Sequence, residues 1–195
     1  MFTGIIESVG EIKAMEKTGT NVHFDISSNL TSSLKVDQSL NHNGVCLTVV
    51  KVNKTYYRVT AIEETLSKSN LGNWEVGDNV NLERCMPATG RFDGHIVQGH
   101  VDQVGSIISI EEMEGSWVFR IKFDPGLGNI TVEKGSICVN GTSLTCFNSS
   151  EGKFSVALIP YTYEHTIFHL LQVGNKVNLE FDILGKYIQR IIKGY

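Results

Sequence analysis

The sequence predicts an all-β protein: two similar six-stranded antiparallel Greek-key barrels in tandem, followed by a C-terminal α-helix. Three observations lead to this fold class. A six-residue motif, NGVCLT at residues 43–48, recurs as NGTSLT at residues 140–145 within a long internal repeat. Each copy alternates apolar and polar residues in short runs, as half-buried strands do. The last twelve residues instead space their apolar side chains as a helix does.

The repeat covers most of the chain. A shift of 97 positions aligns residues 39–83 with residues 136–180 without a gap, and 14 of these 45 positions are identical. Upstream, a shift of 95 positions aligns GIIESVGEI, which starts at Gly4, with GHVDQVGSI, which starts at Gly99. Repeats of this length are whole domains rather than the short units of a solenoid. The chain is therefore expected to consist of two homologous halves.

Short strands and one helical stretch fill each copy. Residues 117–123 and 154–158 alternate apolar and polar side chains, and turn signals recur about every 8–12 residues. Helical stretches are predicted near residues 64–71 and 163–171, between the fifth and sixth strands of each copy. Five or six short strands are best protected from edge pairing when they close into a barrel.

The predicted domains are an N-terminal barrel over residues 1–94, a C-terminal barrel over residues 95–183 and a helix over residues 184–195. The barrels join near residues 92–98. In the helix the apolar residues lie three and four apart and share one face. This face either docks on its own barrel or packs against the same helix of other subunits, and we favour the second because the first copy has no such helix. The face consists of Leu184, Tyr187, Ile188, Ile191, Ile192 and Tyr195.

Composition and charge exclude several classes of protein. A net charge of −4 and a pI of about 5.9 lack the basic footprint of a nucleic-acid-binding protein. No apolar stretch approaches the roughly 18 residues of a membrane span, and the N-terminus lacks the basic and apolar regions of a secretion signal. The four cysteines have no zinc-like spacing. We therefore expect a cytoplasmic protein with reduced cysteines and without nucleic-acid or membrane partners.

The repeated NGxxLT motif is the first candidate site. Its Asn-Gly pair predicts a tight turn between two strands. Residues two apart on a strand share a face, so Cys46 lies beside Thr48 in the first copy and Ser143 beside Thr145 in the second. Small polar groups suit a polar heterocycle or a polyol as ligand. A single Thr would indicate only a good strand former, but the doubling of the cluster favours a ligand site.

Histidines are the other candidates for chemistry. Histidine is the side chain best suited to move protons near neutral pH, and His95 and His100 lie in the segment DGHIVQGHVD between the two copies. For His100 the sequence favours neither a functional nor a structural interpretation over the other. His165 and His169 lie four apart, but no acid or third ligand accompanies them, so no metal site is predicted.

Several motifs, in order, resemble the riboflavin synthase family. They are MFTGIIE, NGVCLTV, ETL, VNLE, GHIVQGHVD, KGSI, NGTSLT and LIPYT, and the resemblance spans residues 1 to about 187. It implies a dismutation in which one molecule of 6,7-dimethyl-8-ribityllumazine donates a four-carbon unit to a second one. The products are riboflavin and 5-amino-6-ribitylaminouracil, and no metal or organic cofactor takes part. Two like substrates would explain two like barrels.

The resemblance also implies an assembly. In the family the reacting pair of lumazines is held between the first barrel of one subunit and the second barrel of its neighbour, within a homotrimer. The predicted C-terminal helix fits the trimer contact. A further candidate partner is lumazine synthase, the enzyme that makes the substrate.

Matching the family motifs position by position gives two predicted pockets. The candidates for catalysis are His100, Ser143 and Thr145 in the second pocket, Cys46 and Ser39 in the first, and Phe2 close to the reacting centre. The first pocket is expected to bind substrate through Gly4, Ile5, Ile6, Cys46, Leu47, Thr48, Thr60, Ala61, Ile62, Glu63, Glu64 and Thr65. The second is expected to use Gly99, His100, Val101, Ser143, Leu144, Thr145, Ala157, Leu158, Ile159, Pro160, Tyr161 and Thr162, with Lys134 reaching across to the ligand.

Two other functions fit a barrel protein of this kind. A non-catalytic lumazine- or flavin-binding antenna resembles the family, but such relatives look eroded in the NGxxLT motifs, whereas both copies are intact here. An oligonucleotide-binding barrel is disfavoured by the acidic charge balance and by the lack of interleaved basic and aromatic residues.

Overall fold

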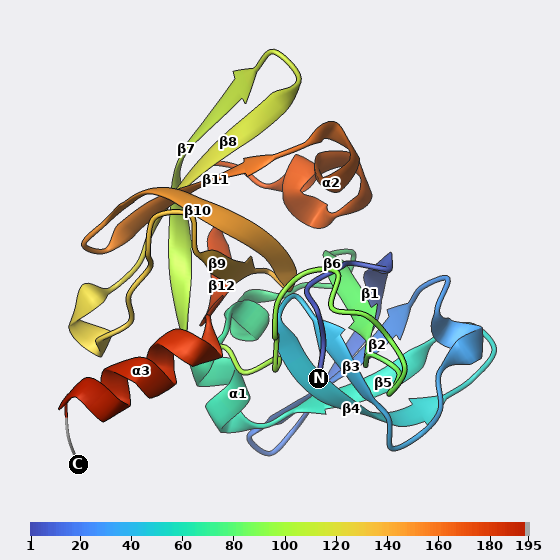
Figure 1. Cartoon of the computed structure of the whole chain (residues 1–195). Helices are drawn as coiled ribbons and strands as arrows, with labels where there is room; N and C mark the ends of the chain where they lie inside the picture. The colour runs from blue at the N-terminus through green and yellow to red at the C-terminus, as the bar shows by residue number, and fades with distance from the viewer. Residues whose placement is uncertain (194–195) are drawn as a thin grey trace.

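The computed structural model describes residues 1–193 and shows two closed antiparallel barrels of six strands each, with a helix at the C-terminal end (Figure 1). The predicted all-β fold class and the tandem of barrels are confirmed. Among residues 1–193, no helix has both the length and the apolar character needed to span a bilayer.

Six strands and one short helix make up the first barrel: β1 (Ser8–Thr18), β2 (Asn21–Ser27), β3 (Ser39–His42), β4 (Val45–Val52), β5 (Tyr57–Ala61), α1 (Glu63–Lys68) and β6 (Asn79–Arg84). Two 3₁₀ turns, η1 (Thr31–Ser33) and η2 (Asn70–Asn73), lie in its connections. The strand order is β1-β2-β5-β4-β3-β6, and β6 closes on β1. This is a Greek key, because hairpins join β3, β4 and β5 in succession and β5 then pairs with β2.

The second barrel repeats this plan with β7 (Gln103–Met113), β8 (Ser116–Lys122), β9 (Ser136–Val139), β10 (Thr142–Ser150), β11 (Lys153–Leu158), α2 (Pro160–His165) and β12 (Lys176–Phe181). Its 3₁₀ turns are η3 (Pro125–Leu127) and η4 (Ile167–Leu170). The strand order, β10-β11-β8-β7-β12-β9, is the ring of the first barrel with each strand replaced by its counterpart. The C-terminal helix α3 (Ile183–Lys193) follows β12 directly.

Both internal helices begin earlier than the sequence predicted. Helix α1 begins at Glu63 and α2 at Pro160, against predicted stretches of 64–71 and 163–171. Proline is favoured in the first turn of a helix because its fixed φ suits that position and its missing N–H costs nothing there. The first turn of α1 instead carries two acidic residues, Glu63 and Glu64, which complement the positive end of the helix dipole.

Each barrel has a hydrophobic core of its own. In the first, Phe24 packs edge-on against Trp74 of the segment after η2, with ring centroids 5.2 Å apart. In the second, Phe119 packs edge-on against Phe168 of η4, also at 5.2 Å. Burial of one such side chain contributes about 1.5–3 kcal/mol. The segments that follow α1 and α2 thus cap the barrels and hold the two helices in place.

The two Asn-Gly turns meet back to back between the barrels. Asn43 and Gly44 have φ of 47° and 87°, and Asn140 and Gly141 have φ of 45° and 80°, the all-positive pattern of a two-residue hairpin. A Cβ added at Gly44 would lie 3.0 Å from the backbone nitrogen of Gly141, and one added at Gly141 would lie 2.9 Å from that of Gly44. Glycine is required at both positions by conformation and by contact.

Buried amides tie each turn to the other barrel. The Nδ2 of Asn81 donates to the Asn140 carbonyl at 2.9 Å, and the Nδ2 of Asn178 donates to the Asn43 carbonyl at 2.8 Å. The side-chain oxygen of Asn178 accepts from the backbone N–H of Asn70 in the opposite barrel. These hydrogen bonds follow the symmetry of the repeat, and they satisfy backbone groups that burial would otherwise leave unpaired.

Helix α3 leaves its apolar face uncovered. Leu184, Tyr187, Ile188, Ile191 and Ile192 are each between 57 and 79% exposed. The interpretation that this face docks on its own barrel is therefore wrong for these residues. An ion pair of 2.6 Å between Lys186 and Asp102 joins the helix to the second barrel. Tyr195, predicted on the same face, lies outside the described residues.

Substitution of Gly44, at the contact between the two turns, should destabilise the protein by more than the cost of its positive φ alone. Gly44→Ala introduces a side chain at positive φ, which costs about 1–2 kcal/mol, and also crowds Gly141. Gly77→Ala is the matched control, because Gly77 has φ of 98° and nothing within 4 Å of an added Cβ. Urea unfolding should show a loss for Gly44→Ala that exceeds the control by at least about 1 kcal/mol. Equal losses would contradict the close contact.

His42 and Tyr57 form a polar pair inside the first core. His42 Nδ1 donates to the Leu40 carbonyl at 3.0 Å, which leaves Nε2 to accept from the Tyr57 hydroxyl at 2.9 Å. Burial lowers the pKa of His42 from 6.5 to about 3, because the charged ring would lose its hydration. The aligned residues of the second barrel are Val139 and Phe154, so only the first barrel carries this pair.

This pair predicts a pH-dependent loss of stability. Below about pH 6.5 the unfolded chain binds a proton at His42, whereas the folded chain does so only near pH 3, so protons favour unfolding in this window. The free energy of unfolding should therefore fall as the pH drops from about 6.5 toward 3. In the double variant His42→Val/Tyr57→Phe, which copies the second barrel, urea unfolding should show a shallower fall. An unchanged slope would contradict the assignment.

Candidate active site

A small cleft adjoins the first NGxxLT strand. It measures about 230 Å³ and is lined by Val45, Cys46, Glu64, Thr65, Lys68, Ser69, Gly99, His100 and Val101. Three parts of the chain build it: the start of β4, helix α1 with the residue after it, and the segment that leads into β7. The last of these belongs to the other half of the repeat. The cleft is therefore shared between the barrels.

The segments before β1 and β7 each cross to the opposite barrel. The carbonyl of Gly99 accepts from the backbone N–H of Cys46 at 2.8 Å, and the carbonyl of Gly4 accepts from that of Ser143 at 2.8 Å. Both glycines have φ of 80°, and an added Cβ would lie 2.6 Å from atoms of Cys46 or Ser143. The prediction grouped Gly4 to Ile6 with Cys46 and Gly99 to Val101 with Ser143, and this grouping is wrong. The segment of Gly4 to Ile6 contacts the Ser143 strand, and the segment of Gly99 to Val101 adjoins Cys46.

Buried carboxylates anchor both crossing segments. Glu83, at the end of β6, accepts from the backbone N–H groups of Thr3 and Gly4. Glu180, at the end of β12, accepts from those of Gln98, Gly99 and His100 at 2.6 to 2.9 Å. Burial raises the pKa of each carboxyl, and the backbone donors partly offset this effect.

His95 is the histidine that contacts Ser143. Its Nδ1 lies 2.6 Å from the Ser143 Oγ, and burial lowers the pKa of its ring despite the opposing charge of Asp182. The prediction that His100 would join Ser143 is corrected: the backbone N–H of His100 binds Glu180, and His100 lines the first cleft. Thr145 is exposed on the same strand. His95 was recognised in the sequence, but without the crossing of segments nothing linked it to Ser143.

Cys46 lies at the edge of a small apolar cluster with Phe2, Val97 and Cys138. Phe2 is fully buried and exchanges two backbone hydrogen bonds with Val97, so its side chain packs between the barrels. Burial raises the pKa of the Cys46 thiol, which keeps it protonated near neutral pH. Cys46 is thus suited to hydrogen bonding rather than to nucleophilic attack.

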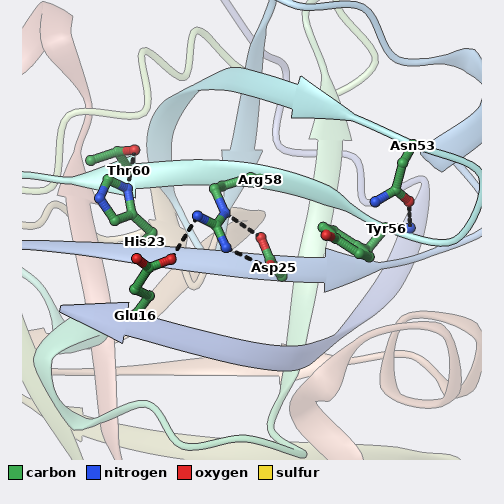
Figure 2. A network of polar contacts seen from close by, with 7 residues as sticks. All are labelled: Glu16, His23, Asp25, Asn53, Tyr56, Arg58 and Thr60. Atoms are coloured by element: carbon green, nitrogen blue, oxygen red, sulfur yellow. Dashed lines mark hydrogen bonds and ion pairs between the residues drawn. The ribbon is translucent and has the colours of Figure 1, made fainter. Parts of the chain in front are cut away.

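Several other predicted residues do not line this cleft. The side chains of Leu47, Ala61 and Leu158 face the barrel cores, so they can offer a ligand only backbone groups. The hydroxyl of Thr60 lies 2.8 Å from His23 Nδ1 (Figure 2). In the same network, on neighbouring strands, Arg58 binds Asp25 through two nitrogens and reaches Glu16.

The remaining predicted residues are accessible. Ser39 lines a separate cleft of about 770 Å³ between the N-terminal segment and residues 85–93. Lys134 is exposed, and its Nζ stands 5.8 Å from the centre of the Phe147 ring. The residues that are exposed or half-buried are Ile5, Ile6, Thr48, Ile62, Glu63, Glu64, Thr65, Leu144, Thr145, Ala157, Ile159, Pro160, Tyr161 and Thr162.

Comparison with known proteins identifies the family. Residues 3–85 and 98–182 match the lumazine binding domain. A riboflavin synthase of Bacillus subtilis (strain 168) is 42% identical over 193 residues, which cover 98% of this chain and 90% of the relative. The chain belongs to the riboflavin synthase family. The riboflavin synthase of Mycobacterium bovis is 40% identical, covering 99% and 98% of the two chains, and that of Saccharomyces cerevisiae is 37% identical, covering 98% and 86%.

Solved structures of LumP have the same fold as this member of the riboflavin synthase family. LumP complexed with riboflavin gives a TM-score of 0.84 at 26% identity, covering 93% of this chain and 99% of LumP. LumP complexed with 6,7-dimethyl-8-(1'-D-ribityl) lumazine gives the same TM-score and coverage at 23% identity. The family resemblance inferred from the sequence motifs is confirmed.

Crowding of the crossing segment should release the His95–Ser143 pair. A Cβ added at Gly94 would overlap the Thr3 carbonyl and stand 2.9 Å from the Ser143 Cβ. In Gly94→Ala the His95 ring should therefore lose its buried position, and its pKa should rise toward about 6.5. An NMR titration of the histidine ring protons measures this shift. Gly72→Ala, whose added Cβ meets only an ordinary 3.5 Å contact, should leave His95 unchanged, and an unshifted His95 in Gly94→Ala would contradict the geometry.

Proposed function

We propose that this protein catalyses the riboflavin synthase reaction, which converts two molecules of 6,7-dimethyl-8-ribityllumazine into riboflavin and 5-amino-6-ribitylaminouracil. One substrate gives up a four-carbon unit and the other receives it, so the two products together hold every atom of the two substrates. The observation that carries the proposal is the pair of NGxxLT strands, each contacted by a segment that crosses from the other barrel. One strand places Cys46 beside an open cleft, and the other carries the Ser143 that contacts His95.

The Ser143 side of the molecule is suited to the proton chemistry. The reaction requires that one lumazine lose a proton from its 7-methyl group, because the resulting carbanion attacks the other lumazine while the ring delocalises its charge. His95 is neutral near pH 7, since burial lowers its pKa, and its Nδ1 lies 2.6 Å from the Ser143 Oγ. A neutral imidazole in hydrogen-bonding reach is a suitable general base. We therefore assign proton transfer to His95 and Ser143.

The first cleft suits the other substrate. Thr65 and Glu64 offer acceptors for ribityl hydroxyls, and Cys46 offers a protonated thiol. Its volume of about 230 Å³ is below the roughly 300–1,000 Å³ of a typical ligand pocket. A surface from a neighbouring subunit would complete it.

An assembly supplies that surface. We assign the reacting pair to the first barrel of one subunit and the second barrel of the next, within a homotrimer held by helix α3. The apolar face of α3 supports this arrangement, because contiguous exposed apolar residues mark interaction surfaces. The functional units are then residues 1–94, 95–183 and 184–195. The same proposal includes a cytoplasmic location and an association with lumazine synthase, which would supply substrate directly.

A lumazine- or flavin-binding antenna is the alternative function. The likeness to LumP, solved with riboflavin at 26% identity, supports binding of a related ligand. Two intact NGxxLT motifs and the contact between His95 and Ser143 favour the enzyme. Incubation with the lumazine substrate separates the two functions. A growing riboflavin absorption spectrum is expected, and a stable lumazine complex without conversion would contradict the enzymatic function.

The assignment of the proton-transfer pair is tested by substitution. His95→Gln and Ser143→Ala should each lower kcat by about 10²-fold, the contribution of a positioned acid–base group. His100→Gln is the matched control, because it changes a histidine of the same segment that has no contact with Ser143, and its loss of kcat should be clearly smaller. Steady-state rates of riboflavin formation measure all three. Equal losses of kcat for His95→Gln and His100→Gln would contradict the assignment of proton transfer to His95 and Ser143.

A further inference from the structure

Glu83 is held by more donors than a backbone anchor requires. Its Oε1 accepts from the Thr3 backbone N–H at 2.6 Å and from the Thr3 hydroxyl at 2.9 Å. The Gly4 N–H lies 3.1 and 3.0 Å from its two oxygens, and the Nδ2 of Asn41 lies 3.5 Å from Oε2. Glu83 itself is only 4% exposed. The carboxylate therefore fixes both the backbone and the side chain of one dipeptide.

That dipeptide contacts both members of the His95–Ser143 pair. The Thr3 carbonyl accepts from the His95 backbone N–H at 3.1 Å, and the Gly4 carbonyl accepts from the Ser143 backbone N–H at 2.8 Å. The two side chains then meet at 2.6 Å. The dipeptide, His95 and Ser143 thus form a closed ring, and Glu83 holds this ring from outside through the Thr3 and Gly4 N–H groups. A shift of the dipeptide would move His95 and Ser143 relative to each other.

We propose that Glu83, on the last strand of the first barrel, is a positioning residue that sets the distance between His95 and Ser143. The inference rests on the proposed function and adds to it a residue that does not contact the reacting atoms. Burial of a carboxylate carries a desolvation cost that its hydrogen-bond partners must offset. The charge is better explained by charge-assisted hydrogen bonds, which are shorter and stronger than neutral ones and hold the dipeptide more firmly.

Glu180 provides a matched comparison within the same chain. It occupies the equivalent position of the second repeat, is 3% exposed, and binds the Gln98, Gly99 and His100 N–H groups. The Gly99 carbonyl then accepts from the Cys46 N–H, as the Gly4 carbonyl does from Ser143. The segment held by Glu180 lines the first cleft, where Cys46 takes the place of Ser143. Loss of Glu180 should therefore disturb substrate binding more than proton transfer, because His95 lies outside the three residues that it binds.

The experiment compares Glu83→Gln with Glu180→Gln in the full chain, with rates measured over a range of lumazine concentrations. Glu83→Gln should lower kcat by about ten- to a hundredfold with KM changed by less than about twofold, because small misplacements of catalytic groups cost rates of this order. Glu180→Gln should instead raise KM severalfold, with a smaller loss of kcat. A second variant, Thr3→Val, removes the hydroxyl bound by Glu83 and should lower kcat in the same direction, by less.

The outcomes separate this inference from the proposed function. If the unsubstituted protein forms no riboflavin, the function itself is wrong. If it forms riboflavin but both glutamate variants change kcat and KM alike, or if Glu83→Gln alters KM alone, Glu83 has no specific positioning role. Should Glu83→Gln fail to fold, Thr3→Val decides: a lower kcat at unchanged KM supports the inference, and an unchanged kcat overturns it.

Discussion

The contact between the two Asn-Gly turns is the constraint on which the rest of the structure depends. Gly44 and Gly141 approach so closely that neither has room for a side chain, and both adopt positive φ. The amides of Asn81 and Asn178 then fasten each turn to the opposite barrel. Since each turn opens the strand that carries Cys46 or Ser143, this one contact fixes the two candidate strands relative to each other.

The architecture was predictable because the internal repeat directly indicates two copies of one fold. Identical positions at a constant shift require two copies of one fold, and alternation within each copy requires strands. The positive φ of the two Asn-Gly pairs follows equally from local chemistry, because few other residues adopt that conformation. Helix α1 begins within one residue of its predicted start, whereas α2 begins three residues early at Pro160, a first-turn proline whose local signal the prediction did not use.

The arrangement of the candidate site was not predictable in the same way. A repeat shows which positions are equivalent, but it does not show whether a segment contacts its own copy or the other. The motif alignment placed Gly4 with Cys46, whereas the structure joins Gly4 to Ser143. The same ambiguity hid the contact of His95 with Ser143, which exists only because the segment that carries His95 crosses between the barrels.

The crossing segments before β1 and β7 are consistent with an origin of the chain by fusion of two identical barrels. One barrel alone cannot finish its own cleft, because the segment before its first strand serves the opposite barrel. Two identical barrels related by a twofold axis would complete each other's clefts. An ancestral homodimer would therefore account for the arrangement. Fusion of its genes would preserve the geometry while ending the need for identical halves. The two halves of such a fused chain can differ, as they do here in Cys46 and in the Ser143 that contacts His95.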